Sequence, residues 1–276
     1  MGKNERIKMA RANRHHIPNQ VWHITHRCHK KEFLLKFARD RRRWYYWLFE
    51  AKKRFGLRVL NYAVTSNHIH LLVQDTEPDV IPNSLQLIAG RTGQEYNIRK
   101  SRKGAFWEDR YHATAIDANE HLSRCLIYID LNMVRAGVVN HPAEWDMNGY
   151  NEIQHPPQRY GVIDKGTLMH LCGFRDSEKF LEQHRQWVQT AIAETARCRE
   201  PCWTESIAVG SKDFVAKTQL ALGIQAKRRS VMETPGGMCV LREETAPYRA
   251  DFECKNEVLN VKNSFFWDKS QIIIVE

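Results

Sequence analysis

The sequence lacks any run of about 18 apolar residues, so we expect no membrane-spanning helix. Its basic start, MGKNERIKMARANRHH, has no apolar segment of the kind found in secretory signals. The seven cysteines are scattered, and the one close pair, Cys198 and Cys202, has no second pair at zinc-binding spacing. We therefore expect reduced thiols in a cytoplasmic protein, with neither a disulfide framework nor a zinc finger.

Acidic residues are scarce at one end of the chain. Residues 1–56 carry 16 Lys and Arg against 4 Asp and Glu, whereas residues 57–150 carry 9 against 11 and residues 151–276 carry 17 against 17. The net charge of +10 therefore comes from the first of these segments. Positive charge gathered in one place predicts the docking of a polyanion such as nucleic acid, and a solvated basic face is the alternative.

A short segment with strict alternation, NHIHLLV at 67–73, predicts a strand with one buried face. His68 and His70 fall on the same side of that strand because side chains alternate with a period of two. Two imidazoles so close together could hold one divalent cation.

About sixty residues further on, YIDLNMVRAG at 128–137 predicts a helix, because apolar residues from Leu122 to Met133 follow helical spacing. Tyr128 and Asn132 lie one turn apart on an adjacent face. A phenol and an amide set opposite two histidines form a candidate metal-plus-nucleophile site.

The predicted elements alternate in a recognisable order. They are a strand at 21–28, a helix at 38–55, strands at 57–65 and 68–74, a helix at 81–99, a strand at 105–116 and the Tyr128 helix. The order β-α-β-β-α-β predicts an α+β, ferredoxin-like (split βαβ) fold, with a four-stranded antiparallel sheet and helices on one face.

The pair Pro156-Pro157 marks a change of character, so we expect one domain at 1–155 and an extension at 156–276. The extension should be mainly helical, with helices at 177–198 and 212–222 and short strands near its end. Its neutral charge balance suits an accessory DNA-recognition or assembly module, which leaves a homodimer open. The segment 203–210, followed by the basic run 227–229, could hold a DNA hairpin stem.

Three segments together resemble a known family: NHIHLLV (67–73), GAFWEDRYH (104–112) and YIDLNMVRAGVV (128–139). They resemble the single-tyrosine HUH transposases, most closely the REP-associated tyrosine transposases with an IS200-like transposase domain. The similarity covers roughly residues 12–155. One departure is Met133, which stands where the family usually has proline, so this helix should be straighter.

The resemblance implies a DNA transposase that cuts and rejoins single-stranded DNA near a hairpin through a 5′-phosphotyrosine intermediate. It implies Tyr128 as the nucleophile and His68, His70 and Asn132 as ligands of Mg²⁺ or Mn²⁺. The basic helix, the basic turn after residue 99 and the two later motifs supply the candidate DNA contacts: Arg41, Arg42, Arg43, Lys52, Lys53, Arg102, Lys103, Arg110 and Arg135. Such a protein would work beside the nucleoid of a prokaryotic cytoplasm.

Two other functions stay open. The chain could be a repeat-DNA-binding protein without catalysis, although Tyr128 and both histidines are present. It could also be a metal-dependent phosphoesterase, which would need a third histidine or acidic ligands where Leu72 and Gln74 stand. Tyr111 is the competing nucleophile, but its predicted place in a strand favours packing or binding.

Overall fold

The computed structural model describes residues 16–194, 200–226, 229–234 and 236–243, all of which belong to one compact unit of the chain. The first four strands are β1 (Val21–Arg27), β2 (Arg58–Val64), β3 (His68–Gln74) and β4 (His112–Ile116), and the first two long helices are α1 (Ala38–Phe55) and α2 (Val80–Arg99). Their chain order is the predicted β-α-β-β-α-β. No helix in the described ranges is long and apolar enough to cross a membrane.

The first four strands lie in the order β2-β3-β1-β4, and each neighbouring pair is antiparallel. The two central strands are therefore the first and third in sequence, which is the ferredoxin-like arrangement predicted from the sequence. This part of the fold prediction is confirmed.

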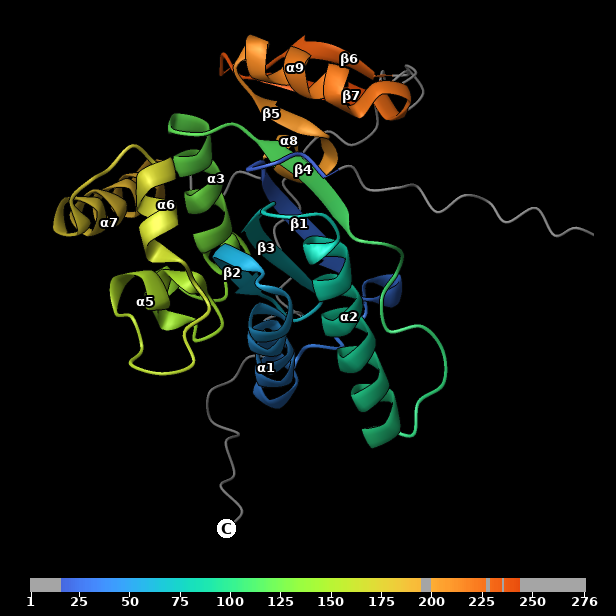
Figure 1. Ribbon diagram of the computed structural model, residues 1–276. Helices are drawn as coiled ribbons and strands as arrows, with labels where there is room; N and C mark the ends of the chain where they lie inside the picture. Colours follow the sequence, from blue (N-terminus) through green and yellow to red (C-terminus); the bar gives the residue numbers. More distant parts are fainter. Residues whose placement is uncertain (1–15, 195–199, 227–228, 235, 244–276) are drawn as a thin grey trace, which may run out of the picture. The chain divides into compact units, whose positions relative to one another are not determined.

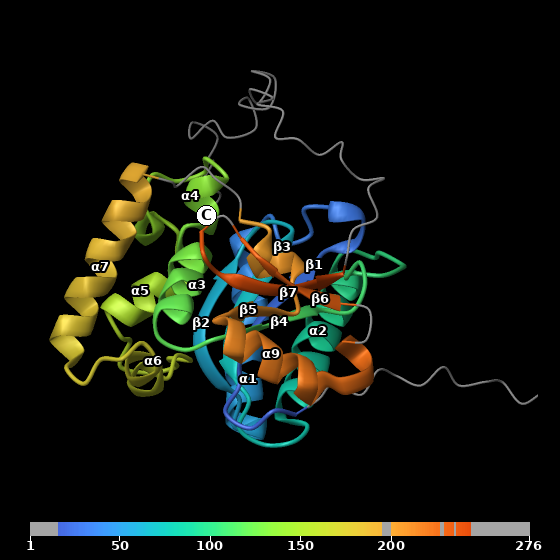
Figure 2. The ribbon, with the colours of Figure 1, turned by 90° about the horizontal axis from the view of Figure 1, so that it is seen from above.

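The two faces of the sheet bury different side chains, as the alternation within each strand requires. On one face Ile24 and Leu71 pack with residues of α1 and α2. On the other face Leu72 and Ile116 pack with residues of α3 (Glu120–Asp130). Figure 1 shows α1 and α2 side by side in front of the strands, and Figure 2 shows α3 on the far side of β2. Helices thus cover both faces of the sheet, so the expectation that they lie on one face only is wrong.

The fourth strand is shorter than the sequence pattern predicts. The prediction of a strand at 105–116 is wrong for its first part, because β4 begins at His112. Residues 108–110 are exposed and irregular, and the main-chain oxygen of Asp109 lies 2.8 Å from Nε2 of His26. Trp107 makes an isolated bridge with Cys28. An irregular segment that contacts β1 thus takes the place of the first part of the predicted strand.

The extension continues the sheet beyond β4. β5 (Ala208–Gly210) runs parallel to β4, and β7 (Cys239–Glu243) and β6 (Arg229–Glu233) follow it, so that the described sheet has seven strands. The extension also contains α6 (Lys165–Leu171), α7 (Ser177–Glu194), α8 (Cys202–Glu205) and α9 (Lys212–Leu222). The helices expected at 177 and 212 are present, although residues 195–198 lie outside the described ranges.

The segment 203–210 is mostly buried. Trp203, Ser206 and Val209 are fully buried. The main chain of Ala115 donates to Ile207 O at 2.7 Å, which fixes this segment against β4. Most of this segment is therefore packed against the sheet, whereas Lys227 and Arg228 lie outside the described residues, so the expectation that this region holds a hairpin stem stays a prediction. The division of the chain at residue 155 stays a prediction.

The position of α3 is fixed by buried polar contacts at its last residue. Asp130 is fully buried, and its carboxylate accepts from Asn61 Nδ2 at 2.9 Å. His184 Nε2 of α7 lies 2.7 Å from the other carboxylate oxygen. Asn148 Nδ2 donates to the main-chain oxygen of Asp130 at 2.7 Å. These contacts join α3 to β2, to the extension and to the connecting loop.

We expect His184→Ala to lower the free energy of unfolding by about 3–5 kcal/mol, because it leaves Oδ2 of the buried Asp130 carboxylate without its partner, while Asn61 still donates to Oδ1. Urea denaturation followed by circular dichroism measures this change. Arg54→Ala is the control, since it removes a more exposed ion pair with Glu50 and should cost under about 1 kcal/mol. A cost for His184→Ala no larger than that of the control would contradict the anchoring role of this pair.

Candidate functional site

The antiparallel register of β1 and β3 brings the candidate histidines together with residues of the first strand. Thr25 pairs with His70, Arg27 with His68, and His23 with Leu72. Because paired residues project to the same face, these side chains face α3 rather than α1 and α2.

The turn before β3 fixes the ring of His68. Its Nδ1 lies 2.7 Å from Asn67 Oδ1 and 3.0 Å from Thr65 Oγ1. An amide oxygen can only accept, so Nδ1 of His68 carries the hydrogen and Nε2 is the unprotonated nitrogen. This tautomer is the one that could bind a cation through Nε2.

His70 lies deeper, with only 2 % of its surface exposed. Its Nε2 accepts from the side-chain amide of Asn132 at 2.7 Å, and its Nδ1 lies 2.9 Å from His23 Nε2. The rings of His68 and His70 are 5.0 Å apart between centroids. Burial holds the pKa of His70 well below its ordinary value, so the ring is neutral.

Tyr128 and Asn132 reach the histidines from α3 and α4 (Asn132–Arg135). The Tyr128 ring lies 5.9 Å from the ring of His70 and 6.1 Å from that of His23, between centroids, and is 5 % exposed. The helix is interrupted at Leu131, although no proline is present there. The sequence-based expectation of a straighter helix at Met133 is therefore not met, yet Tyr128 and Asn132 still converge on His70.

Arg135 lies directly over the nucleophile candidate. Its guanidinium carbon is 4.0 Å from the centroid of the Tyr128 ring, and NH2 donates to Tyr128 O at 2.5 Å. Burial lowers the pKa of Arg135, while Tyr128 nearby raises it. The Arg135 guanidinium thus lies close enough to interact with the phenol and with an anion that approaches it.

His68, His70 and Asn132 fit a cation of the expected kind. Two neutral imidazole nitrogens and an amide oxygen, after a half-turn of the Asn132 side-chain amide, would supply borderline and hard donors suited to Mn²⁺ or Mg²⁺. Among the residues that the structure describes, no group of three or more His, Cys, Asp or Glu side chains could hold a metal ion. Asn132 is thus needed to complete a set of three.

The candidate DNA contacts divide into two groups. Arg41 donates to Leu35 O and also to Lys36 O, Arg43 pairs with Glu95, Lys52 donates to Gly161 O, and Arg102 donates to Ala105 O. These four have partners within the protein. The other group is exposed to solvent: it consists of Arg42, which lies beside Arg39, Arg43 and Tyr46, and of Lys53, Lys103 and Arg110.

Two residues of the site were not anticipated from the sequence. His23 lies among His70, Tyr128 and Trp203, and Arg27 stands opposite His68. The alternation of β1 already places both on one face. The missing information was the register with β3, which only the tertiary structure supplies.

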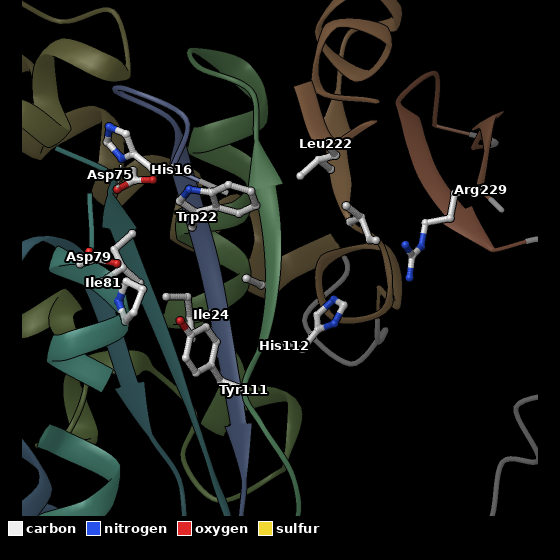
Figure 3. Close-up of a pocket in the computed structure, with 13 residues that line it drawn as sticks. His16, Trp22, Ile24, Asp75, Asp79, Ile81, Tyr111, His112, Leu222 and Arg229 are labelled. Atoms are coloured by element: carbon white, nitrogen blue, oxygen red, sulfur yellow. Dashed lines mark ion pairs between the residues drawn. The ribbon is translucent and has the colours of Figure 1, made fainter. Parts of the chain in front are cut away.

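A pocket of about 430 Å³ lies on the opposite face of the sheet, and Figure 3 shows its lining. Its lining includes Trp22 and Ile24 of β1, Leu222 and Arg229 of the extension, and Tyr111, which is drawn beside Ile24. Tyr111 is partly buried and packs against the core cluster that contains residues of α1 and α2. It is therefore separated by the sheet from His68 and His70, which argues against it as the nucleophile.

One family model matches part of the chain. Residues 17–132 match the family model described as "Transposase IS200 like", which agrees with the resemblance seen in the sequence. No curated protein matches the chain significantly.

Two solved structures are similar in part. A REP-associated tyrosine transposase bound to a REP hairpin is 18% identical, with a TM-score of 0.43 over 50% of this chain and 81% of its own. A putative transposase from Deinococcus radiodurans R1 is also 18% identical, with a TM-score of 0.31 over 39% of this chain and 85% of its own. At these TM-scores, neither similarity bears on function.

We expect His70→Ala to lower the affinity for Mn²⁺ by more than the roughly 10–100-fold that loss of an outer hydrogen-bond partner costs, because it removes a direct ligand. Isothermal titration with MnCl₂ measures the dissociation constant. His26→Ala is the matched control. His26 is likewise a histidine of the central strands, on β1, but its ring stacks on Trp107, away from the site. Equal affinity in His70→Ala and the wild type would remove His70 from the ligand set.

Proposed function

Because residues 17–132 match the family of IS200-like transposases, we propose that the protein is a transposase that cuts and rejoins single-stranded DNA near a hairpin. The observation that supports this most is the convergence of one tyrosine on the two histidines. The Tyr128 ring lies 5.9 Å from the His70 ring, and Asn132 donates to that same imidazole.

Tyr128 would attack the scissile phosphorus in line with the leaving 3′ oxygen. A bond forms between the phenolic oxygen and phosphorus, the P–O3′ bond breaks, and the 3′ oxygen takes up the proton that the phenol loses. The products are a 5′-phosphotyrosine and a free 3′-hydroxyl. Attack by a 3′-hydroxyl on the phosphotyrosine reverses these steps and joins strands, so no ATP is needed.

The surroundings of Tyr128 suit this role. Arg135 over the ring favours the phenolate, which is the stronger nucleophile, and can accompany the phosphate charge. His68, His70 and Asn132 would hold and orient Mg²⁺ or Mn²⁺. Either ion, when bound, would supply positive charge that offsets the charge of the scissile phosphate.

The substrate should be unpaired at the cleavage position. Tyr128 is 5 % exposed and lies in α3, so a strand held in a duplex could not bring its phosphate beside the phenol. A protein acting on such DNA would work at the nucleoid, and a homodimer is compatible with this proposal.

We expect Tyr128→Phe to abolish the covalent protein–DNA product, because phenylalanine keeps the ring under Arg135 but removes the attacking oxygen. The assay incubates labelled single-stranded hairpin DNA from the flanks of the gene with protein and Mn²⁺, followed by a denaturing gel. Tyr111→Phe is the matched control and should keep the product, since Tyr111 lies on the opposite face.

The other outcomes separate the alternatives. Cleavage that persists in Tyr128→Phe would make water the nucleophile and favour a metal-dependent phosphoesterase. Hairpin binding without cleavage, in the wild type and in both variants, would favour a repeat-DNA-binding protein without catalysis.

The DNA path can be tested through the cations near the site. Arg27 stands opposite His68, and the main chain of Glu108 donates to Arg27 O at 2.9 Å, which brings the loop that contains Arg110 to the same end of the sheet. The main chain of Leu35 donates to Ser66 O at 2.9 Å, so α1 begins near the turn that precedes His68, and Lys53 lies in the last turn of α1, about 20 Å of helix further on.

We expect Arg27→Ala to weaken binding of single-stranded DNA and to lower the slope of log K against log salt by about 0.7, the value for one phosphate contact. Fluorescence anisotropy at several salt concentrations measures both. Lys53→Ala, which removes the same charge far from His68, should have the smaller effect. A larger effect of Lys53→Ala would place the DNA along α1 instead.

A further inference from the structure

We infer that His23 is a positioning residue for the active site: it holds His70 in the tautomer whose Nε2 can bind a cation, and the main-chain carbonyl of Trp203 holds His23 in turn. This inference depends on the proposed function, since it takes His70 as a ligand. It adds one residue of the first strand and one residue of the extension to the site.

The series of hydrogen bonds begins at a main-chain carbonyl, which can act only as an acceptor. The carbonyl oxygen of Trp203 can only accept a hydrogen bond, and it lies 2.8 Å from Nδ1 of His23. Nδ1 of His23 therefore carries a hydrogen. Thr114 Oγ1 lies 3.2 Å from the same carbonyl oxygen.

The second contact follows from the first. A neutral imidazole has one hydrogen, so Nε2 of His23 is an acceptor once Nδ1 is the donor. It lies 2.9 Å from Nδ1 of His70, which must then be a donor. The two rings are inclined by only 13°, so this hydrogen bond runs close to both ring planes.

The third contact, between His70 and Asn132, involves the nitrogen that would bind the cation. With its hydrogen on Nδ1, His70 has its lone pair on Nε2, and this is the atom to which Asn132 donates at 2.7 Å. The protein thus presents the His70 lone pair toward Asn132, which together with His68 is also proposed to hold the ion. Outer partners of this kind set the orientation and basicity of metal-bound histidines.

A charged His23 would reverse this chain, because it would donate from both nitrogens. Its surroundings argue against the charge: His23 is fully buried, and its two hydrogen-bond partners are a main-chain carbonyl and a second imidazole, neither of which carries a negative charge. The neutral ring is therefore the favoured form, and the direction of the hydrogen bonds follows from it.

The carbonyl that starts the chain is itself immobilised. Trp203 lies in α8 and its side chain is fully buried, with its ring centroid 6.2 Å from that of Tyr128. Thr114 Oγ1 of β4 also donates to Ser206 O at 2.7 Å, which secures the end of α8. The extension therefore supplies the carbonyl that accepts from His23, and residues 1–155 alone would lack this acceptor.

The first measurement determines the tautomers in the full-length protein without metal. Long-range ¹H–¹⁵N correlation spectra of histidine-labelled protein distinguish a hydrogen on Nδ1 from one on Nε2. We expect Nδ1–H for both His23 and His70 in the wild type, and a shift of His70 toward Nε2–H in His23→Phe. An Nε2–H tautomer of His70 in the wild type would overturn the inference.

The second measurement is Mn²⁺ affinity by isothermal titration. We expect His23→Phe to weaken binding about 10–100-fold, and His23→Gln to recover part of the loss because its amide oxygen can accept from His70. His112→Gln is the matched control and should stay within about twofold. His112 also contacts a carbonyl of the extension, Ser206 O at 2.9 Å, yet does not touch His70.

The outcomes distinguish this inference from the proposed function. Wild-type affinity in His23→Phe would overturn the inference and leave the proposed function standing. An equal loss in His112→Gln would also overturn it, since the effect would then come from general loosening of the extension. Absence of Mn²⁺ binding by the wild type would overturn the proposed metal site. If His23→Phe does not fold, His23→Gln and the wild-type tautomers decide the question.

Discussion

The antiparallel register of β1 against β3 is the constraint on which the site depends. It sets Thr25 opposite His70 and Arg27 opposite His68, and it places His23 on the same face. A shift by one residue would turn the side chains of one strand to the face covered by α1 and α2. Buried residues on both faces oppose such a shift, so the same apolar packing that stabilises the sheet also fixes the site.

The site combines a rigid sheet with polar anchors from the rest of the chain. Asp130 ties α3 to Asn61 and His184, two positions beyond the tyrosine that the mechanism requires. Trp203 O accepts from His23 on the other side. Buried polar groups are costly unless paired, and here each pair also determines where Tyr128 or His70 lies. Stability and positioning are therefore supplied by the same contacts.

The two faces of the sheet have different tasks. The face toward α3 gathers histidines, the tyrosine and Asn132, whereas the face toward α1 and α2 holds an apolar core and a pocket extended by Leu222 and Arg229. Several arginines of α1 that the sequence offers for DNA contact are engaged in internal pairs, as Arg43 is with Glu95. A basic composition thus does not by itself show which cations face solvent and which are paired within the protein.

The sequence by itself determined the order of the first strands and helices, because their periodicities are local properties of the chain. It also determined that His68 and His70 share a face and that Tyr128 and Asn132 share another, since both spacings are set by a strand or a helix. Only the tertiary structure decided that His23 joins them and that Trp203, 180 residues away, supplies its acceptor. Strand register and long-range packing depend on contacts across the whole fold, and no local pattern encodes them. The same reason explains why the predicted strand at 105–116 was too long and why β5 at 208–210 joins β4.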